Sequence, residues 1–180
     1  MLGSLSETQT RQDLLSYVQR FSPEAREVFD YFRFEDFVDR LEVQDILYPV
    51  VQRFAGTDLS PQRLDNFGMG VVFVELIRKF AEASNETAGE HFTPRDVVDV
   101  TTSLVFTGQQ DRLKAGSIVS IYDPAAGTGG FLSEGKVYIR SISDCVDVSL
   151  YGQELNPESY AICEADMLIK GQRIDNIKLG

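Results

Sequence analysis

One glycine-rich stretch carries the residues best suited to hold a ligand. It reads Asp123-Pro-Ala-Ala-Gly-Thr-Gly-Gly-Phe131, and it follows an apolar run at residues 117–122 and precedes a helix-competent run at residues 131–140. Gly127, Gly129 and Gly130 allow positive φ angles and a close approach of a ligand to the backbone, and the free N–H groups at the start of the following helix offer donors. The spacing therefore predicts a strand, a turn that holds a small molecule, and a helix.

The acid that opens this turn indicates a cationic ligand rather than a dinucleotide. The dinucleotide fingerprint Gly-x-Gly-x-x-Gly requires a third glycine where this chain has Leu132. Asp123 would repel a pyrophosphate, whereas it suits an ammonium group. S-adenosylmethionine carries a sulfonium and an α-ammonium and no phosphate, so it fits this turn. Glu154 follows the next predicted strand, at residues 146–152, where an acid can accept hydrogen bonds from both ribose hydroxyls, a role that nicotinamide and S-adenosyl cofactors share.

Helices and strands alternate in the second half of the chain. Thr93-Pro94 predicts a helix cap and a first turn, before an apolar helix that ends near Phe106, and Asn156-Pro157 repeats this signal after the second strand. A third strand is predicted at residues 174–179. This alternation predicts an α/β fold with a doubly wound, mostly parallel, Rossmann-like sheet whose ligands lie at the carboxyl ends of the strands.

The first half of the chain carries helical rather than strand periodicity, which predicts an N-terminal helical bundle. Ser22-Pro23 and Ser60-Pro61 each predict an N-cap followed by a first-turn proline, and Pro49 predicts a break or kink within residues 43–54. The polar residues 84–87 are the expected linker. We therefore predict a helical domain at residues 1–85 and part of a cofactor-binding domain at residues 86–180.

The charge balance and the cysteine spacing exclude several other classes of function. The chain has 17 basic and 28 acidic residues and a net charge of -11, which disfavours stand-alone binding to nucleic acid. Cys145 and Cys163 lack metal-ligand spacing and His91 is the sole histidine, so we expect no metal site and no catalytic base from this histidine. No stretch is long and apolar enough to span a membrane, and the N-terminus lacks a basic region followed by an apolar one, which favours a cytoplasmic protein.

Three segments together resemble the adenine-N6 DNA methyltransferase subunit, or modification subunit, of type I restriction-modification systems. They are Gly89-Glu-His-Phe-Thr-Pro-Arg95, the glycine-rich turn, and Tyr151-Gly-Gln-Glu-Leu-Asn-Pro157, and they occur in the order of that family. The resemblance covers roughly residue 65 to the end. It implies that S-adenosylmethionine is the methyl donor, that DNA is the substrate, and that a specificity subunit and a restriction (nuclease) subunit are partners.

By this resemblance, the contacts to the donor come from three places in the chain. The turn would wrap the methionine part of the donor, residues 90–95 would close over it, and Glu154 would hold the ribose. The implied cofactor-binding residues are Glu90, His91, Phe92, Thr93, Pro94, Arg95, Asp123, Pro124, Ala125, Gly127, Thr128, Gly129, Gly130 and Glu154. Phe92 could instead be core, and Thr93 and Pro94 would be needed as a helix cap with or without a ligand.

The chain departs from this family because it lacks the catalytic loop. Enzymes that methylate an exocyclic amine carry an Asn/Asp-Pro-Pro-aromatic loop, which accepts hydrogen bonds from the amine and stacks on the flipped base. Asn156-Pro157-Glu158 lacks the second proline and the aromatic residue, so we interpret it as a cap. We therefore expect the catalytic residues to lie beyond Gly180 and this fragment to be inactive alone.

A partial sheet of this kind leaves a strand edge and an apolar face uncovered, which predicts partner contacts or self-association. Two other functions stay open at this stage. One is a non-catalytic binding or assembly module, and the other is a methyltransferase that acts on cytosine N4 or on protein glutamine.

Overall fold

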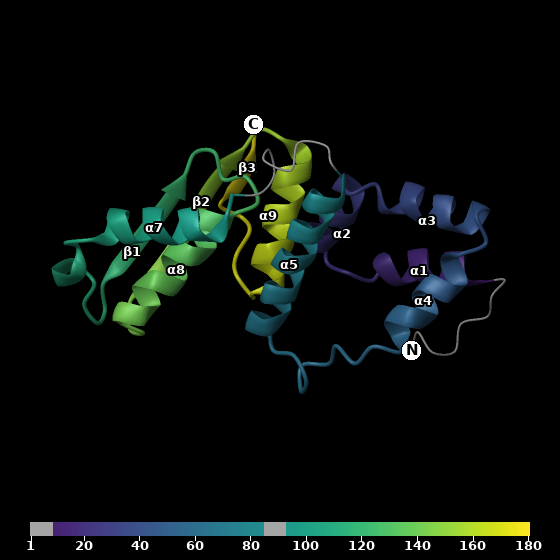
Figure 1. The fold of residues 1–180 in the computed structure, drawn as a ribbon, viewed down its shortest axis with the longest axis horizontal. Coiled ribbons are helices and arrows are strands. Elements are labelled where there is room, and N and C mark those ends of the chain that lie inside the picture. Colours follow the sequence, from purple (N-terminus) through teal and green to yellow (C-terminus); the bar gives the residue numbers. More distant parts are fainter. Residues whose placement is uncertain (1–8, 85–92) are drawn as a thin grey trace. The chain divides into compact units, whose positions relative to one another are not determined.

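The computed structural model describes residues 9–84 and 93–180, and its contacts divide the chain into two units, Met1–Asp65 and Asn66–Gly180. Each unit has its own packing and is described separately (Figure 1). None of the helices within the described ranges is long and apolar enough to cross a membrane.

The first unit is helical, as predicted. Its helices are α1 (Thr10–Val18), α2 (Pro23–Tyr31), α3 (Phe34–Val43) and α4 (Leu47–Ala55). A small core joins three of them, with Val38, Leu47 and Val51 buried and Leu14, Phe34 and Leu41 packed against these.

Two proline signals in this unit mark helix starts. The Ser22 hydroxyl accepts a hydrogen bond from the backbone N–H of Ala25 at 3.4 Å, and α2 begins at Pro23, which confirms the predicted cap. The break predicted within residues 43–54 is present, since α3 ends at Val43 and α4 begins at Leu47, and it lies just before Pro49. Pro49 itself is in the first turn of α4, where its backbone nitrogen has no helical partner to lose.

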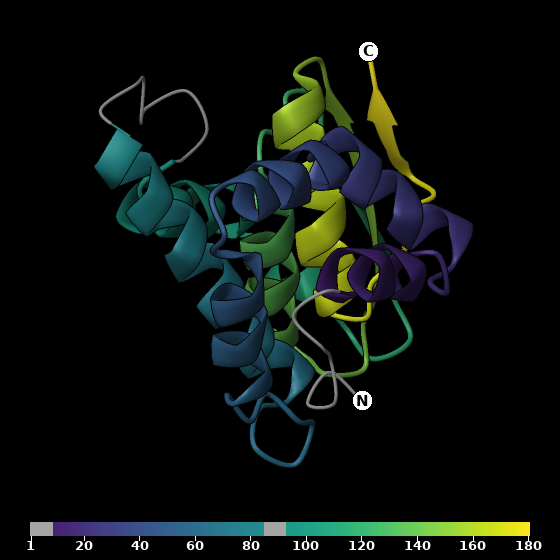
Figure 2. The ribbon, with the colours of Figure 1, turned by 90° about the vertical axis from the view of Figure 1, so that its right-hand side faces the viewer.

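The second unit is a parallel α/β structure. It contains α5 (Asn66–Ser84), α7 (Arg95–Phe106), a 3₁₀ turn at Gln110–Arg112, β1 (Ile118–Asp123), α8 (Gly130–Ile142), β2 (Asp147–Glu154), α9 (Pro157–Ile169) and β3 (Ile177–Leu179). The strand order is β1-β2-β3, both pairs are parallel, and β3 forms an outer edge of the sheet (Figure 2). The predicted α/β class and the three predicted strands are confirmed.

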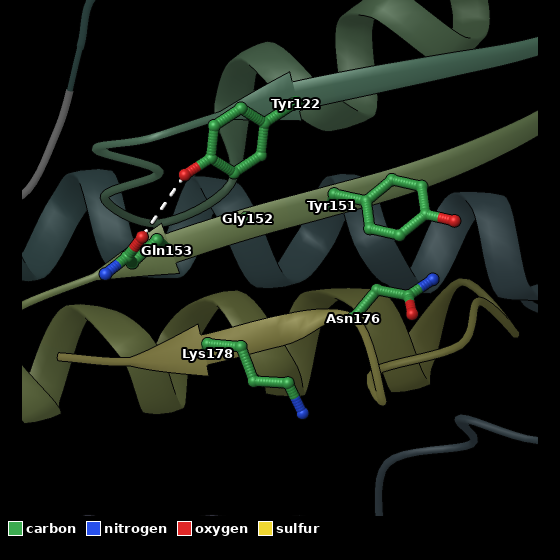
Figure 3. A pocket seen from close by; sticks show the side chains of 6 residues that line it. All are labelled: Tyr122, Tyr151, Gly152, Gln153, Asn176 and Lys178. Atoms are coloured by element: carbon green, nitrogen blue, oxygen red, sulfur yellow. Dashed lines mark hydrogen bonds between the residues drawn. The ribbon is translucent and has the colours of Figure 1, made fainter.

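The helices cover one face of this sheet. α8 packs on β1 and β2, and α9 packs on β2 and β3, so Val148, Leu150 and Gly152 are buried while their neighbours along β2 are not. On the opposite face, Tyr122 is 60% exposed and Tyr151 is 40% exposed, and these two residues pair across the strands. A hollow of about 440 Å³ lies on this face. Figure 3 shows side chains that line it, among them Tyr122, whose hydroxyl donates a hydrogen bond to Gln153 Oε1 at 3.2 Å. Contacts of this face with a partner or a second copy stay a prediction.

The division between the units differs from the predicted domain boundary. We placed the boundary at residue 85, after α5, but α5 packs on α9 and belongs to the second unit. Gly70 faces α9 in this contact, and a Cβ atom there would lie 2.7 Å from Lys170 Cε. The periodicity of α5 showed a helix with a buried face, and it contained no information on which partner that face meets.

Two predicted helix starts are also corrected. Ser60-Pro61 begins only a turn, in which Arg63 and Leu64 donate their backbone N–H groups to the Ser60 carbonyl, and α5 starts later, at Asn66. At α7 the N-cap position is occupied by Pro94 rather than Thr93, without a capping side chain, so the predicted start was early by one residue.

Candidate functional site

The glycine turn joins the carboxyl end of β1 to the amino end of α8. Gly127 (φ +54°) and Gly129 (φ +83°) adopt the left-handed conformation that favours glycine, as predicted. Gly130 does not, because it is already the first residue of α8. A Cβ atom on Gly129 would lie 2.7 Å from Cys163 Sγ, so the turn packs directly on α9 and has no room for a side chain at this position.

Two carboxylates stand at the carboxyl ends of neighbouring strands. Asp123 Oδ1 accepts a hydrogen bond from the Ala125 backbone N–H at 3.1 Å. Glu154 Oε2 accepts from the Gly127 backbone N–H, and its Oε1 accepts from the Asn156 backbone N–H, each at 2.7 Å. Glu154 therefore lies where the sequence placed it and also ties the glycine turn to β2, a role that the sequence did not predict.

The segment after Glu154 is held as a helix cap. The Asn156 side-chain oxygen accepts hydrogen bonds from the backbone N–H groups of Glu158 and Ser159, at 2.8 and 3.0 Å, and α9 starts at Pro157. This geometry confirms the interpretation of Asn156-Pro157 as a cap and explains how the strand that carries Glu154 passes directly into α9.

A buried polar cluster beside the turn was missed by the sequence reasoning. Lys170 Nζ lies 2.5 Å from Asp166 Oδ2 and donates to Ser133 Oγ at 2.9 Å, while the Ser133 hydroxyl donates to Asp166 Oδ2 at 3.0 Å. The Asp166 side chain is only 4% exposed and that of Lys170 18%. The i, i+4 spacing of Asp166 and Lys170 is the one feature of the sequence that could have predicted their ion pair. It does not predict the contact with Ser133 on α8.

The turn opens on a cavity of about 700 Å³, within the usual range of small-molecule sites. Thr93 and Arg95, at the start of α7, line this cavity together with the turn, and parts of α5, α8 and α9 complete it. The predicted residues that line it are Thr93, Arg95, Ala125, Gly127, Thr128 and Gly130. The structure thus brings two of the three predicted segments to one cavity.

The remaining predicted residues are placed differently. Asp123, Pro124, Gly129 and Glu154 shape or border the turn without lining the cavity, and Pro94 precedes α7. The predictions for Glu90, His91 and Phe92 lie outside the described residues.

Nucleophilic and metal chemistry find no support near the turn. Burial, followed by the negative charges of Asp166, Glu164, Asp123 and Glu154, raises the pKa of the Cys163 thiol to about 12, so this thiol stays protonated at neutral pH. Within residues 9–84 and 93–180, no three side chains of the metal-binding types gather at one place. The chemistry available here is the binding of a polar ligand by backbone amides and carboxylates.

Comparisons with known proteins agree on one family. The family of N-6 DNA methylases matches residues 65–180, which is more than half of the chain. The HindI methylase subunit of a type I restriction enzyme from Haemophilus influenzae is 29% identical over 106 residues, which are 57% of this chain and 21% of that protein. The EcoKI methylase subunit from Escherichia coli is 34% identical over 83 residues, which are 46% of this chain and 14% of that protein.

Solved structures show the same fold. A type I restriction-modification methyltransferase subunit from Streptococcus thermophilus matches 96% of this chain and 37% of its own length, with a TM-score of 0.68 and 22% identity. A modification subunit of a putative type I restriction enzyme from Vibrio vulnificus matches 76% of this chain and 28% of its own, with a TM-score of 0.51 and 23% identity. The chain spans about a fifth of the length of the HindI relative.

Proposed function

The chain belongs to the N-6 DNA methylase family, and from this premise we propose that it carries the methyl-donor site of an S-adenosylmethionine-dependent adenine-N6 DNA methyltransferase. The whole enzyme would be the modification subunit of a type I restriction-modification complex in the cytoplasm, with a specificity subunit and a restriction subunit as partners. The family match favours adenine N6 over cytosine N4 or protein glutamine as the methyl acceptor.

The observation that carries the proposal is the glycine turn closed by Glu154. Its backbone bends through two left-handed glycines, the Gly127 amide donates to a carboxylate of the neighbouring strand, and a cavity of about 700 Å³ opens beside it. When bound, the donor supplies an electrophilic methyl group on a sulfonium. The two strand-end carboxylates beside the turn are suited to a ligand that is cationic and rich in donors.

Asp123 is the residue that we assign to the α-ammonium group of the donor. One of its oxygens is engaged by the Ala125 N–H, and in the described part of the chain no hydrogen-bond partner occupies the other. Glu154, which already accepts two backbone N–H groups, would add ribose hydroxyls through its remaining lone pairs. Thr93 and Arg95 would contact the donor from the start of α7.

The catalytic step requires residues outside the 180 of this chain. Its sequence has no Asn/Asp-Pro-Pro-aromatic segment, and the one partial mimic, at Asn156, is occupied as a helix cap. We therefore expect donor binding without methyl transfer to DNA. Transfer of a labelled methyl group to DNA by this chain alone would contradict this expectation.

Calorimetry with S-adenosylmethionine and S-adenosylhomocysteine tests the site. The variant Asp123→Asn should bind about tenfold or more weakly, because a hydrogen bond to a charged group contributes about 1.5–3 kcal/mol. Asp144→Asn is the matched control, since it removes one negative charge at an exposed position after α8. Equal affinity in the parent and both variants would refute the role of Asp123, and a parent chain that binds neither compound would refute the proposal for these residues.

A further inference from the structure

The cavity continues away from the turn as a groove between α5 and α8. The wall on α8 consists of Ser133, Lys136, Val137 and Arg140, whose i, i+3, i+4, i+7 spacing places them on one face of the helix. The opposite wall has the same spacing on α5, at Val71, Val74, Glu75 and Arg78. In Figure 1, α9 lies between these two helices, and it contributes Asp166 and Lys170 to the groove.

This groove is basic in a chain that is strongly acidic. It is lined by five basic and three acidic side chains, namely Arg78, Arg95, Lys136, Arg140 and Lys170 against Glu75, Glu134 and Asp166. The whole chain has 17 basic and 28 acidic residues. The groove therefore concentrates positive charge that the composition alone would not reveal.

Within the described residues, three of these cations have no ion pair, namely Arg95, Lys136 and Arg140. Arg78 is paired with Glu75, at 2.6 Å, and Lys170 with Asp166, at 2.5 Å. For Lys136 and Arg140, the described residues supply no carboxylate within 4 Å. They lie four residues apart on α8, where like charges repel by about 0.2–0.5 kcal/mol.

The surroundings of Lys136 add to this uncompensated charge. Its side chain is half-buried, and burial, followed by repulsion from Arg140, lowers the pKa of its ammonium group against a smaller opposing attraction from Asp147. An anion bound between the two side chains would relieve both effects. A site for negative charge is therefore built into the exposed side of α8.

We propose that Lys136 and Arg140 bind phosphate groups of a DNA strand that lies in the groove between α5 and α8. This inference rests on the proposed function, which requires DNA to approach the donor turn. The groove extends from the turn at Gly130 to Arg140, ten residues of helix or about 15 Å. That length matches about four nucleotides of one strand in B-form DNA, at a rise of 3.4 Å each, so a DNA backbone spans it and a single free phosphate does not.

The test is the salt dependence of DNA binding by the whole chain, measured by fluorescence anisotropy with a labelled oligonucleotide duplex. Each phosphate contact contributes about 0.9 to the slope of log affinity against log salt concentration. The double variant Lys136→Gln/Arg140→Gln should therefore lower the slope by about 2. Between about 50 and 200 mM salt, the affinity of the parent should fall about tenfold more than that of the variant.

The matched control is Arg112→Gln/Lys114→Gln, which removes the same two charges from exposed positions before β1. An equal loss in both double variants would show a general charge effect and would overturn the inference. A parent chain without measurable DNA affinity at about 50 mM salt would overturn it as well.

Two further measurements separate the alternatives. The chain could bind inorganic phosphate through Lys136 and Arg140 and bind no DNA. That result would identify free phosphate as the ligand and would overturn the DNA assignment. Calorimetry with S-adenosylmethionine on the parent chain shows separately whether the donor binds. If the donor binds but DNA affinity does not depend on Lys136 and Arg140, only this inference fails. If DNA affinity depends on them but the donor does not bind, only the proposed function fails.

Discussion

Replacing Glu154 by glutamine tests whether this carboxylate closes the glycine turn. In the structure, one oxygen accepts from the Gly127 N–H and the other from the Asn156 N–H, each at 2.7 Å. A glutamine has the same shape but only one acceptor oxygen, and its NH₂ group would face a second donor. One of the two backbone N–H groups must therefore lose its partner in Glu154→Gln.

The expected cost follows from that geometry. A hydrogen bond to a charged group contributes about 1.5–3 kcal/mol, and a donor left without an acceptor in a partly buried site costs about 1–3 kcal/mol. We expect the free energy for opening the turn to fall by about 2 kcal/mol, which corresponds to a roughly 30-fold faster exchange of its protected amide hydrogens.

Hydrogen exchange of the peptide that contains residues 123–130, followed by mass spectrometry, measures this opening locally. Asp144→Asn is again the control, and we expect a change within about 0.5 kcal/mol for that exposed side chain. Exchange in Glu154→Gln that is no faster than in the control would refute the role of Glu154 in closing the turn. Unchanged affinity for S-adenosylmethionine in the same variant would separately refute its assignment to the ribose.

Four further predictions concern the two turn glycines, thiol chemistry and charge. Gly127→Ala should cost about 1–2 kcal/mol of unfolding free energy, since its φ of +54° is unfavourable for alanine but no atom lies within 4 Å of an added Cβ. Gly129→Ala should cost about 1–3 kcal/mol more, because its Cβ would lie 2.7 Å from Cys163 Sγ, and adding Cys163→Ala should recover that part in thermal unfolding. At pH 8 an alkylating reagent should label the exposed Cys145 and spare the buried Cys163. Because the pKa of Cys163 is raised in the folded state, its thiol ionises first in the unfolded chain, so the free energy of unfolding should fall from about pH 9 to about pH 12. This fall should be smaller in Cys163→Ala. Arg11→Gln should lower the unfolding temperature of the helical unit, and the difference should shrink at high salt, because Arg11 contacts three carboxylates of α3 at 2.7 to 3.3 Å.

The features that the sequence predicted well depend on neighbouring residues. The caps at Ser22 and Asn156 are local, since a side-chain oxygen meets an N–H group two or three residues ahead. The left-handed glycines of the turn are local in the same sense. The parallel α/β fold could be predicted from the order of strands and helices around the turn alone.

The features that the sequence missed depend on pairings between distant segments. The cluster of Ser133, Asp166 and Lys170 joins residues 33 and 37 positions apart, and the bond from Gly127 to Glu154 spans 27. Both require the packing of α8 and α9 on the sheet to be known. The assignment of α5 to the wrong domain has the same origin, because an amphipathic helix does not specify the surface against which it packs.

The way the turn is held determines which variants can separate binding from stability. Gly129 packs on α9 and Glu154 bonds the turn from β2, so a change at either position should weaken the fold and the donor site together. Asp123 differs, because within the described residues its side chain accepts a hydrogen bond only from the N–H of Ala125, two residues ahead. An asparagine can keep that bond through its side-chain oxygen while it removes the charge. In Asp123→Asn we therefore expect a loss of donor affinity at unchanged stability. This combination would show that the charge of Asp123 recognises a cationic ligand.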